Sequence, residues 1–309
     1  MTDTETPVDR SRWTVPFLVL AIASGCMMYR ILVMRHLEQT SLLFVGIPTL
    51  LAVIIAFTPA AKTTAGGIIK AVSLALLLSA PLLGEGFICI LMAAPIFFAV
   101  GLLAWGLALL VRKITLKRKG KSAVLPCLAL LSLAPMSLEG TRPELSFRRE
   151  ETVTVRRVVA GTPAEVEAAL SHSPHIGPAL PAYLRLGFPR PTEADGDGLA
   201  PGDLRRIHFA GGEGHPGDLL LRVVESGPGH VRFAVVSDKS KVAHWLDWEY
   251  ADVRWQAVAG SRDFTEVEWT LGYRRLLDPA WYFRPWERYG VRLAAGYLIQ
   301  TNATPAEHR

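Results

Sequence analysis

Cysteine is scarce in this chain. The 309 residues include 3 cysteines, Cys26, Cys89 and Cys127, and none lies in the sequence beyond residue 127. A disulfide framework, or a zinc site built from thiolates, requires several cysteines close together. Neither can form in the carboxy-terminal half of the chain.

Histidine does not supply a metal site either. The closest pair, His172 and His175, has Pro174 between its members and no adjoining third ligand, so a helix cannot present both imidazoles on one face. The glycine-rich stretch 211–217 lacks the Lys-Ser/Thr step of a phosphate-binding loop. We therefore expect neither a metal nor a cofactor.

Charged residues are rare in residues 1–140 outside short loops. Between those loops lie apolar segments of about the ~20 residues that a helix needs to cross a bilayer. The last segment contains Pro126 and Pro135, each of which removes a backbone donor that lipid cannot replace. We predict an α-helical transmembrane bundle of about five spans, at 14–34, 41–59, 66–83, 87–111 and 123–138. A soluble domain is expected over 141–309.

The loop after the fourth predicted span has six cations and no acid: Arg112, Lys113, Lys117, Arg118, Lys119 and Lys121. Positively charged loops stay in the cytoplasm, which places the amino terminus there as well. If segment 123–138 crosses the membrane, the carboxy-terminal domain lies outside the cytoplasm. If that segment only enters the interface, the domain is cytoplasmic. The pattern favours an integral protein of a bacterial inner membrane.

The formal net charge of +5 does not indicate nucleic-acid binding. Residues 1–140 hold 12 Lys and Arg against 6 Asp and Glu, whereas residues 141–309 hold 21 against 22. The excess positive charge belongs to the apolar half. Arginines of the second half are scattered and form no stripe along which a phosphate backbone could run. We expect no nucleic-acid partner.

The second half alternates between strand and helix periodicity. A strand over 152–160 leads to Thr162, Pro163 and Glu165, a sequence typical of a helix start, and that helix continues to Ser171. A short helix is expected near 177–186. Strands follow at 203–210, 218–225, 230–237, 245–258 and 262–276, before a closing helix that is most regular over 285–300.

This order resembles the SRPBCC superfamily, also called START-like or helix-grip, which has polyketide cyclase and lipid-transfer branches. The resemblance covers about residues 150–301. It is carried by Val153-Thr154-Val155 running into Thr162-Pro163-Ala164-Glu165-Val166, and by Thr265-Glu266-Val267-Glu268-Trp269 leading to Tyr273-Arg274-Arg275 and the last helix. It implies an α+β domain whose curved antiparallel sheet wraps round the last helix, with an apolar cavity between them. The superfamily has no universal catalytic residue, so none is transferred.

Aromatic residues point to the wall of that cavity. One face of strand 262–276 presents Trp269 and Tyr273, and aromatic and apolar residues recur at three- and four-residue steps along the closing helix. A buried phenol needs a polar partner, which suits a pocket wall better than a dry core. The predicted cavity residues are Trp269, Tyr273, Tyr282, Trp286, Tyr289, Leu293 and Tyr297. Ordinary core packing is the alternative for each.

Candidates for catalysis are less distinctive. His208 and His244 lie in or beside strands and could act as general bases, although surface histidines have the same pattern. Asp247 and Glu249 stand two residues apart on one strand face and could form a carboxylate pair; a solvated strand face is the alternative.

Three functions fit the sequence. The favoured one is a non-catalytic, membrane-anchored module that binds a lipid or another hydrophobic small molecule. The second is a polyketide cyclase-like or hydrolytic enzyme that uses the same cavity. The third is a subunit that docks a partner protein.

Overall fold

The structure is a computed structural model of the chain, and it describes residues 21, 61–83, 87–114, 139, 144, 146–177, 180–211 and 216–305. The chain divides into two compact units, Met1–Pro135 and Met136–Arg309. The predicted spans 41–59 and 123–138, and all of 14–34 except Ala21, lie outside the described residues.

Two helices are described in the first unit, α4 (Thr64–Leu83) and α5 (Phe87–Ile114), and they coincide with the third and fourth predicted spans. Leu76 and Ile90 are buried where the two helices pack. A Cβ added at Gly101 would lie 2.9 Å from Ile68, so this glycine allows a close approach between them. Within the described part of the chain, no helix is identified as both long and apolar enough to cross a membrane.

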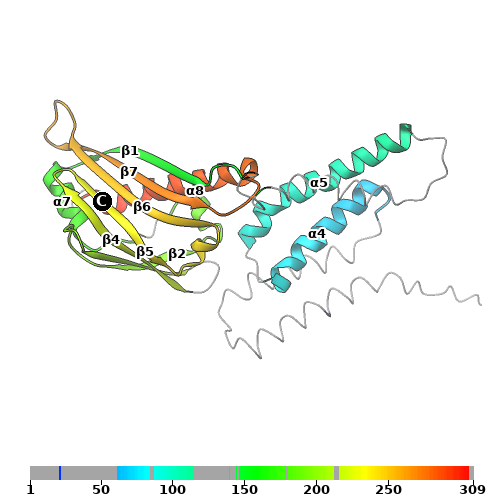
Figure 1. The fold of residues 1–309 in the computed structure, drawn as a ribbon, viewed down its shortest axis with the longest axis horizontal. Helices are drawn as coiled ribbons and strands as arrows, with labels where there is room; N and C mark the ends of the chain where they lie inside the picture. The colour runs from blue at the N-terminus through cyan, green and yellow to red at the C-terminus, as the bar shows by residue number, and fades with distance from the viewer. Residues whose placement is uncertain are drawn as a thin grey trace, which may run out of the picture. The chain divides into compact units, whose positions relative to one another are not determined.

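The second unit is built on one antiparallel sheet of seven strands, in the order β1-β7-β6-β5-β4-β3-β2. The sheet curls round the long helix α8 (Figure 1). The strands are β1 (Glu150–Ala160), β2 (Arg190–Asp195), β3 (Leu204–Gly211), β4 (Gly217–Gly227), β5 (His230–Asp238), β6 (Leu246–Ala257) and β7 (Phe264–Arg275). The helices are α7 (Pro163–Ser171), η4 (Ala182–Arg185), η5 (Lys241–His244), α8 (Ala280–Leu298) and η6 (Ile299–Ala303).

This arrangement confirms the predicted helix-grip fold of the carboxy-terminal half. The first strand of the domain, β1, pairs with the last strand, β7, so the two ends of the domain sequence lie side by side in the sheet. Strand β2 differs from expectation, because no strand was expected between the short helix at 177–186 and the strand at 203–210. It stands last in the strand order and pairs with β3 alone, which makes it an edge strand.

Local chemistry explains why α7 begins where it was predicted to begin. The Glu165 backbone N–H donates to Thr162 Oγ1 at 3.3 Å, and the Thr162 N–H donates to Glu165 Oε2 at 2.7 Å. Pro163 occupies the first helical turn, where the absent N–H has no partner to lose. This reciprocal capping box fixes the start of the helix that follows β1.

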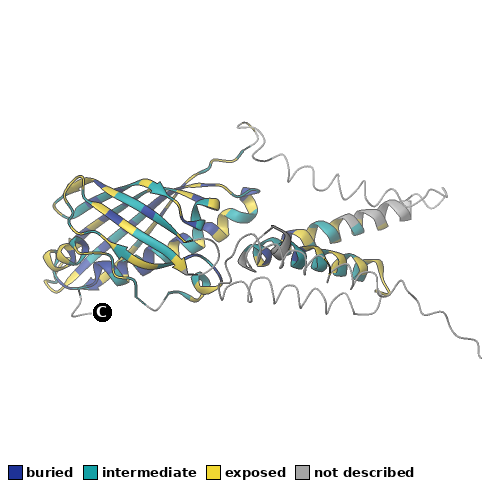
Figure 2. Cartoon of the chain, turned by 90° about the horizontal axis from the view of Figure 1, so that it is seen from below, coloured by how far each residue is buried: buried dark blue, intermediate teal, exposed yellow. Residues whose placement is uncertain are grey.

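Burial alternates along the strands that carry the core (Figure 2). In β7 the inward positions Thr265, Val267, Trp269, Leu271 and Tyr273 are all buried, as the sequence predicted. Apart from Thr265, these side chains belong to one cluster with Val291, Ala295 and Ile299 of the carboxy-terminal helical segment. The core therefore lies between the sheet and α8.

Strand β6 departs from simple alternation. Trp248 pairs with Tyr273 and Tyr250 pairs with Gly272, so Glu249 is an extra residue with no opposite partner. Such a bulge switches the inward face. Leu246 is buried before the bulge, and Ala251, Val253 and Trp255 are buried after it. A regular period of two, which would keep one face inward along the whole strand, therefore does not hold for β6.

Candidate functional site

Helix α8 turns a different face to the sheet from the one the sequence suggested. Its buried residues are Ala280, Glu287, Val291, Ala295, Gly296 and Tyr297. Of the predicted cavity residues, Trp286 is 39 % exposed, Tyr289 is 52 % exposed, and Tyr282 and Leu293 are half-buried. The predicted aromatic stripe exists, but most of it lies outside the core.

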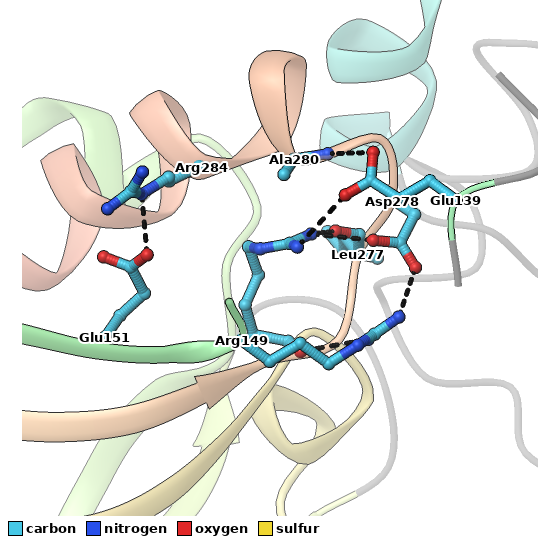
Figure 3. A network of polar contacts seen from close by, with 8 residues as sticks. Glu139, Arg149, Glu151, Leu277, Asp278, Ala280 and Arg284 are labelled. Carbon is cyan, nitrogen blue, oxygen red and sulfur yellow. Dashed lines mark hydrogen bonds and ion pairs between the residues drawn. The ribbon is translucent and has the colours of Figure 1, made fainter. Parts of the chain in front are cut away.

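The face that α8 buries is determined by two of its arginines, which pair with an acidic residue of β1. Glu151 of β1 is 4 % exposed and faces α8. Its carboxylate lies 2.6 Å from Arg284 Nε and 2.6 Å from Arg288 Nη1. These two arginines direct their helix face to β1, and Trp286, which lies between them in the sequence, is left facing outward. The pairing of Glu151 with Arg284 is visible in Figure 3.

The strand residues of the predicted site lie in the interior. Trp269 is 6 % exposed and Tyr273 is fully buried, both on the inward face of β7. The Tyr273 ring packs edge-on against Trp248, with 5.8 Å between ring centroids. Tyr297 is also buried, and its hydroxyl donates to the Gly177 carbonyl at 2.8 Å. Tyr297 thus has its polar partner within the domain.

Several other buried polar atoms have no such partner. Among the described residues, nothing hydrogen-bonds the Tyr273 hydroxyl, the Trp269 indole N–H, the Tyr183 hydroxyl or either carboxyl oxygen of Glu287. Glu287 is 7 % exposed. Tyr273 and Trp269 lie on β7, four residues apart, whereas Tyr183 lies in η4 and Glu287 lies on α8. We refer to Glu287, Tyr273, Trp269 and Tyr183 as the interior polar cluster.

Burial strongly perturbs Glu287. Desolvation raises the pKa of its carboxyl from 4.5 to about 8; Arg275 opposes the shift, while Glu151 and Asp278 add to it. The Leu277 backbone also lowers this pKa, but less than desolvation raises it. Glu287 is therefore protonated and neutral at pH 7. A neutral carboxyl both donates and accepts hydrogen bonds.

The two phenols of the cluster are affected by the same carboxyl. Burial raises the pKa of Tyr183 to about 12, with further contributions from Tyr289 and Glu287. Burial also raises the pKa of Tyr273, again with Glu287 and Glu151 adding to the shift. Both phenols remain protonated donors. Each of the two phenols therefore lies within electrostatic range of Glu287.

An aromatic group extends from this cluster. The Tyr183 ring lies 5.1 Å from Phe188 and 5.1 Å from Tyr289, and Phe188 lies 5.5 Å from Trp245, measured between centroids. A Cβ at Gly290 would meet Tyr183 at 3.3 Å, so this glycine allows η4 to approach α8 closely. Tyr183 thus connects the exposed Tyr289 to the interior.

A buried ionic network fixes the turn from β7 to α8 (Figure 3). Arg275 is fully buried, and its guanidinium lies 2.9 Å from Asp278 and 3.4 Å from Glu139. Arg149 reaches the other oxygen of Asp278 at 2.6 Å. Glu139 also accepts from the Ala280 backbone N–H at 3.0 Å, which satisfies an orphan donor at the helix start. By fixing where α8 begins, this network sets the position of Glu287 two turns later.

The structure does not bring the catalytic candidates together in the interior. His208 Nδ1 lies 2.6 Å from Asp218 Oδ1, but these two residues alternate with buried Arg205 and Leu219 and so lie on the outer face. His244, Asp247 and Glu249 are exposed. Across the described ranges, no group of three or more His, Cys, Asp or Glu is arranged to hold a metal.

Sequence reasoning missed Glu287 and Tyr183. The sequence does not single out Glu287, because an acid is rarely buried. The signal that identifies it is the spacing of small and apolar residues at 280, 291 and 295, which share its helix face. Tyr183 lies in a proline-rich stretch whose conformation has no periodic signal.

No protein-family model matches this chain, and no curated protein matches it. Solved structures with a similar fold include truncated norcoclaurine synthase from Thalictrum flavum, at 13 % identity and a TM-score of 0.33, covering 50 % of this chain and 94 % of that one. The Zhui aromatase/cyclase from a Streptomyces species matches at 12 % identity and a TM-score of 0.33, covering 52 % and 93 %. A protein from Thermus thermophilus matches at 14 % identity and a TM-score of 0.31, covering 49 % and 96 %.

Proposed function

We propose that this chain is a membrane-anchored helix-grip module that binds a lipid or another hydrophobic small molecule without transforming it. The observation that carries the proposal is the interior polar cluster. Its polar atoms are buried, and no described residue hydrogen-bonds them. Side chains of this kind are rare in folded proteins, and each calls for a partner such as a ligand or an ordered water.

The energetics favour a bound partner. A buried donor or acceptor without a hydrogen bond destabilises a protein by about 1–3 kcal/mol. Here a carboxyl, two phenols and an indole N–H are affected together. A molecule that satisfies two or more of them gains this energy in addition to the burial of its own apolar surface.

The surroundings define the class of ligand. The core next to the cluster consists of aliphatic and aromatic side chains, including Leu271, Val291 and Trp248, which suit an apolar body. The cluster offers donors together with the neutral Glu287 carboxyl. A hydroxyl, carbonyl or amide head group fits this set. An anionic head is disfavoured, because a charge is costly to bury in a site of low dielectric constant.

The support for membrane anchoring lies in the sequence. Residues 1–140 contain apolar segments of membrane-spanning length around a loop of six cations. A tether raises the local concentration of molecules that dissolve in the bilayer. We place the amino terminus in the cytoplasm and the binding domain outside it. Resistance to alkaline carbonate extraction tests the anchoring, and a reporter enzyme fused after Arg309 tests the side.

Native mass spectrometry of the full-length protein, purified in mild detergent, tests the binding. We expect one co-purifying apolar molecule per chain, identified after solvent extraction. Tyr273→Phe removes an unpaired hydroxyl and should lower the occupied fraction. Tyr297→Phe is the matched control, since its hydroxyl is already bonded to Gly177. Equal occupancy in both variants, or an empty wild-type domain, would contradict the proposal.

One observation supports a second candidate function, an acid-base enzyme of the cyclase type. A buried carboxyl with a pKa of about 8 can take up and release a proton near neutral pH. The test is to incubate the extracted molecule with fresh protein. A change in its mass or isomer composition that depends on Glu287 supports an enzyme, and an unchanged molecule supports binding alone.

A further inference from the structure

Helix α8 has a second aromatic face that the core does not use. Trp281 is 63 % exposed, Tyr289 is 52 % exposed and Trp286 is 39 % exposed. Tyr282 connects two of them, with ring centroids 5.7 Å from Trp281 and 6.4 Å from Trp286. Single exposed aromatic residues are common, but several on one helix face usually mark an interaction surface. We call Trp281, Tyr282, Trp286 and Tyr289 the outer aromatic face.

The neighbourhood of this face is apolar and cationic. Leu276 is 36 % exposed and Leu186, next to η4, is 45 % exposed. Arg292 on α8 and Arg185 in η4, which packs against α8, are exposed. Tryptophan and tyrosine flanked by arginine form the composition found where proteins meet the interface of a bilayer.

The position of Glu139 shows where the chain enters the domain relative to the outer aromatic face. Its carboxylate accepts from the N–H of Ala280, the residue immediately before Trp281, at 3.0 Å. A second bond to buried Arg275 fixes Glu139 at that point. Residue 139 directly follows the apolar segment 123–138 in the sequence. The chain therefore enters the domain at the end of α8 that carries the outer aromatic face.

We propose that the outer aromatic face docks into the interface of the bilayer that anchors the chain. Trp281, Trp286 and Tyr289 lie at the level of the lipid head groups, and the exposed arginines contact lipid phosphates. This inference rests on the membrane anchoring proposed above. It adds a defined orientation, in which α8 lies along the membrane surface and the rest of the sheet points away from it.

Docking also gives the ligand a route. Tyr289 belongs to the docked face and packs edge-on against Tyr183, whose buried hydroxyl belongs to the interior polar cluster. This pair of rings therefore links the docked face to the buried Tyr183 hydroxyl. An apolar molecule can pass between bilayer and domain beside these rings without crossing bulk water.

Fluorescence quenching by brominated lipid tests the proposal on the full-length chain. The protein is reconstituted in nanodiscs of phosphatidylcholine that carries bromine in the upper acyl chain, and its tryptophan emission is compared with that in unbrominated nanodiscs. We expect Trp281→Phe and Trp286→Phe each to reduce the bromine-dependent quenching. Trp255→Phe is the matched control because Trp255 is buried in β6, and it should leave the quenching unchanged.

The variant Trp105→Phe distinguishes docking from anchoring, because Trp105 lies inside the fourth predicted span. If Trp105→Phe reduces the quenching while Trp281→Phe and Trp286→Phe do not, the chain is anchored and the docking proposal is wrong. If wild-type protein shows no quenching, anchoring fails and docking fails with it. Acrylamide completes the test: protection of Trp281 without quenching by lipid would assign the face to a protein partner and overturn the proposal.

Discussion

The Glu139 carboxylate accepts a hydrogen bond from the backbone N–H of Ala280, 141 residues away along the chain, at 3.0 Å. The same carboxylate lies 3.4 Å from the guanidinium of Arg275, which is fully buried. One acidic residue therefore ties the start of the domain both to the end of β7 and to the first turn of α8. The turn before α8, which positions Glu287, is therefore held by residues from the two ends of the domain sequence.

Breaking this buried network should be far more damaging than breaking a surface ion pair. Asp278→Ala removes the closest carboxylate of Arg275 and leaves a buried charge poorly compensated, so we expect a loss of about 3–5 kcal/mol in the free energy of unfolding. Asp195→Ala breaks the exposed Arg206 pair and should lower the free energy of unfolding far less. Chemical denaturation of both variants measures the difference, and similar losses would count against a structural role for Arg275.

Removing an unsatisfied hydroxyl should stabilise the empty domain. Tyr273→Phe deletes a fully buried polar group that has no hydrogen bond within the described structure. We expect the ligand-free variant to gain about 1 kcal/mol of unfolding free energy while it binds ligand less tightly. Thermal unfolding after delipidation gives the first effect, and reloading with the extracted molecule gives the second. A variant that is destabilised in the empty state would show that the hydroxyl has a partner within the protein.

Glu287 should make the domain more stable in mild acid than in mild base. Its pKa is raised from 4.5 to about 8 in the folded state, so between these values the folded chain holds a proton that the unfolded chain has released. Stability from this residue is fully present below about pH 4.5 and is lost as the pH rises toward 8, by at most about 1.4 kcal/mol per pH unit. Unfolding measured from about pH 5 to about pH 8 gives the slope.

The control for this pH dependence is Glu287→Gln, which keeps the shape and removes the titration. Its stability should vary less over the same range, and the difference between the two profiles isolates Glu287 from the other acids. Parallel profiles would mean that the carboxyl titrates at its ordinary value.

Gly272 should be intolerant of a side chain because of the ring opposite it. A Cβ at this position would lie 2.1 Å from Tyr250 Cε1, and Arg232 holds that ring in place with its guanidinium 4.2 Å from the centroid. We expect Gly272→Ala to lower the unfolding free energy by about 1–3 kcal/mol. Combining it with Tyr250→Thr, which removes the ring and suits a strand, should recover part of the loss. No recovery in the double variant would show that backbone strain, and not the ring, disfavours the side chain.

The sequence predicted the parts of this fold that depend on local period and capping. The strand-to-helix step at Thr162 and the inward face of β7 followed from side-chain chemistry and alternation. Strand β2 did not, because its sequence Arg-Pro-Thr-Glu-Ala-Asp has no alternating apolar residues. Its place comes from pairing with β3 at the sheet edge, which is a tertiary effect.

Faces were harder to predict than elements. The bulge at Glu249 reverses the inward side of β6 within a single strand, and only the pairing with β7 reveals it. The rotation of α8 is a similar case, since aromatic content suggested one face and the pairing of Arg284 and Arg288 with Glu151 selected another. For the site, this meant that Trp269 and Tyr273 could be named in advance, whereas buried Glu287 could not.

The most direct test of the account is an experimental structure of the full-length protein purified without delipidation. We predict density for an elongated apolar molecule between α8 and the sheet, with its polar end within hydrogen-bonding distance of Glu287 and Tyr273. A structure in which Glu287, Tyr273 and Trp269 are satisfied by protein groups or by ordered water alone, with no molecule between them, would contradict it.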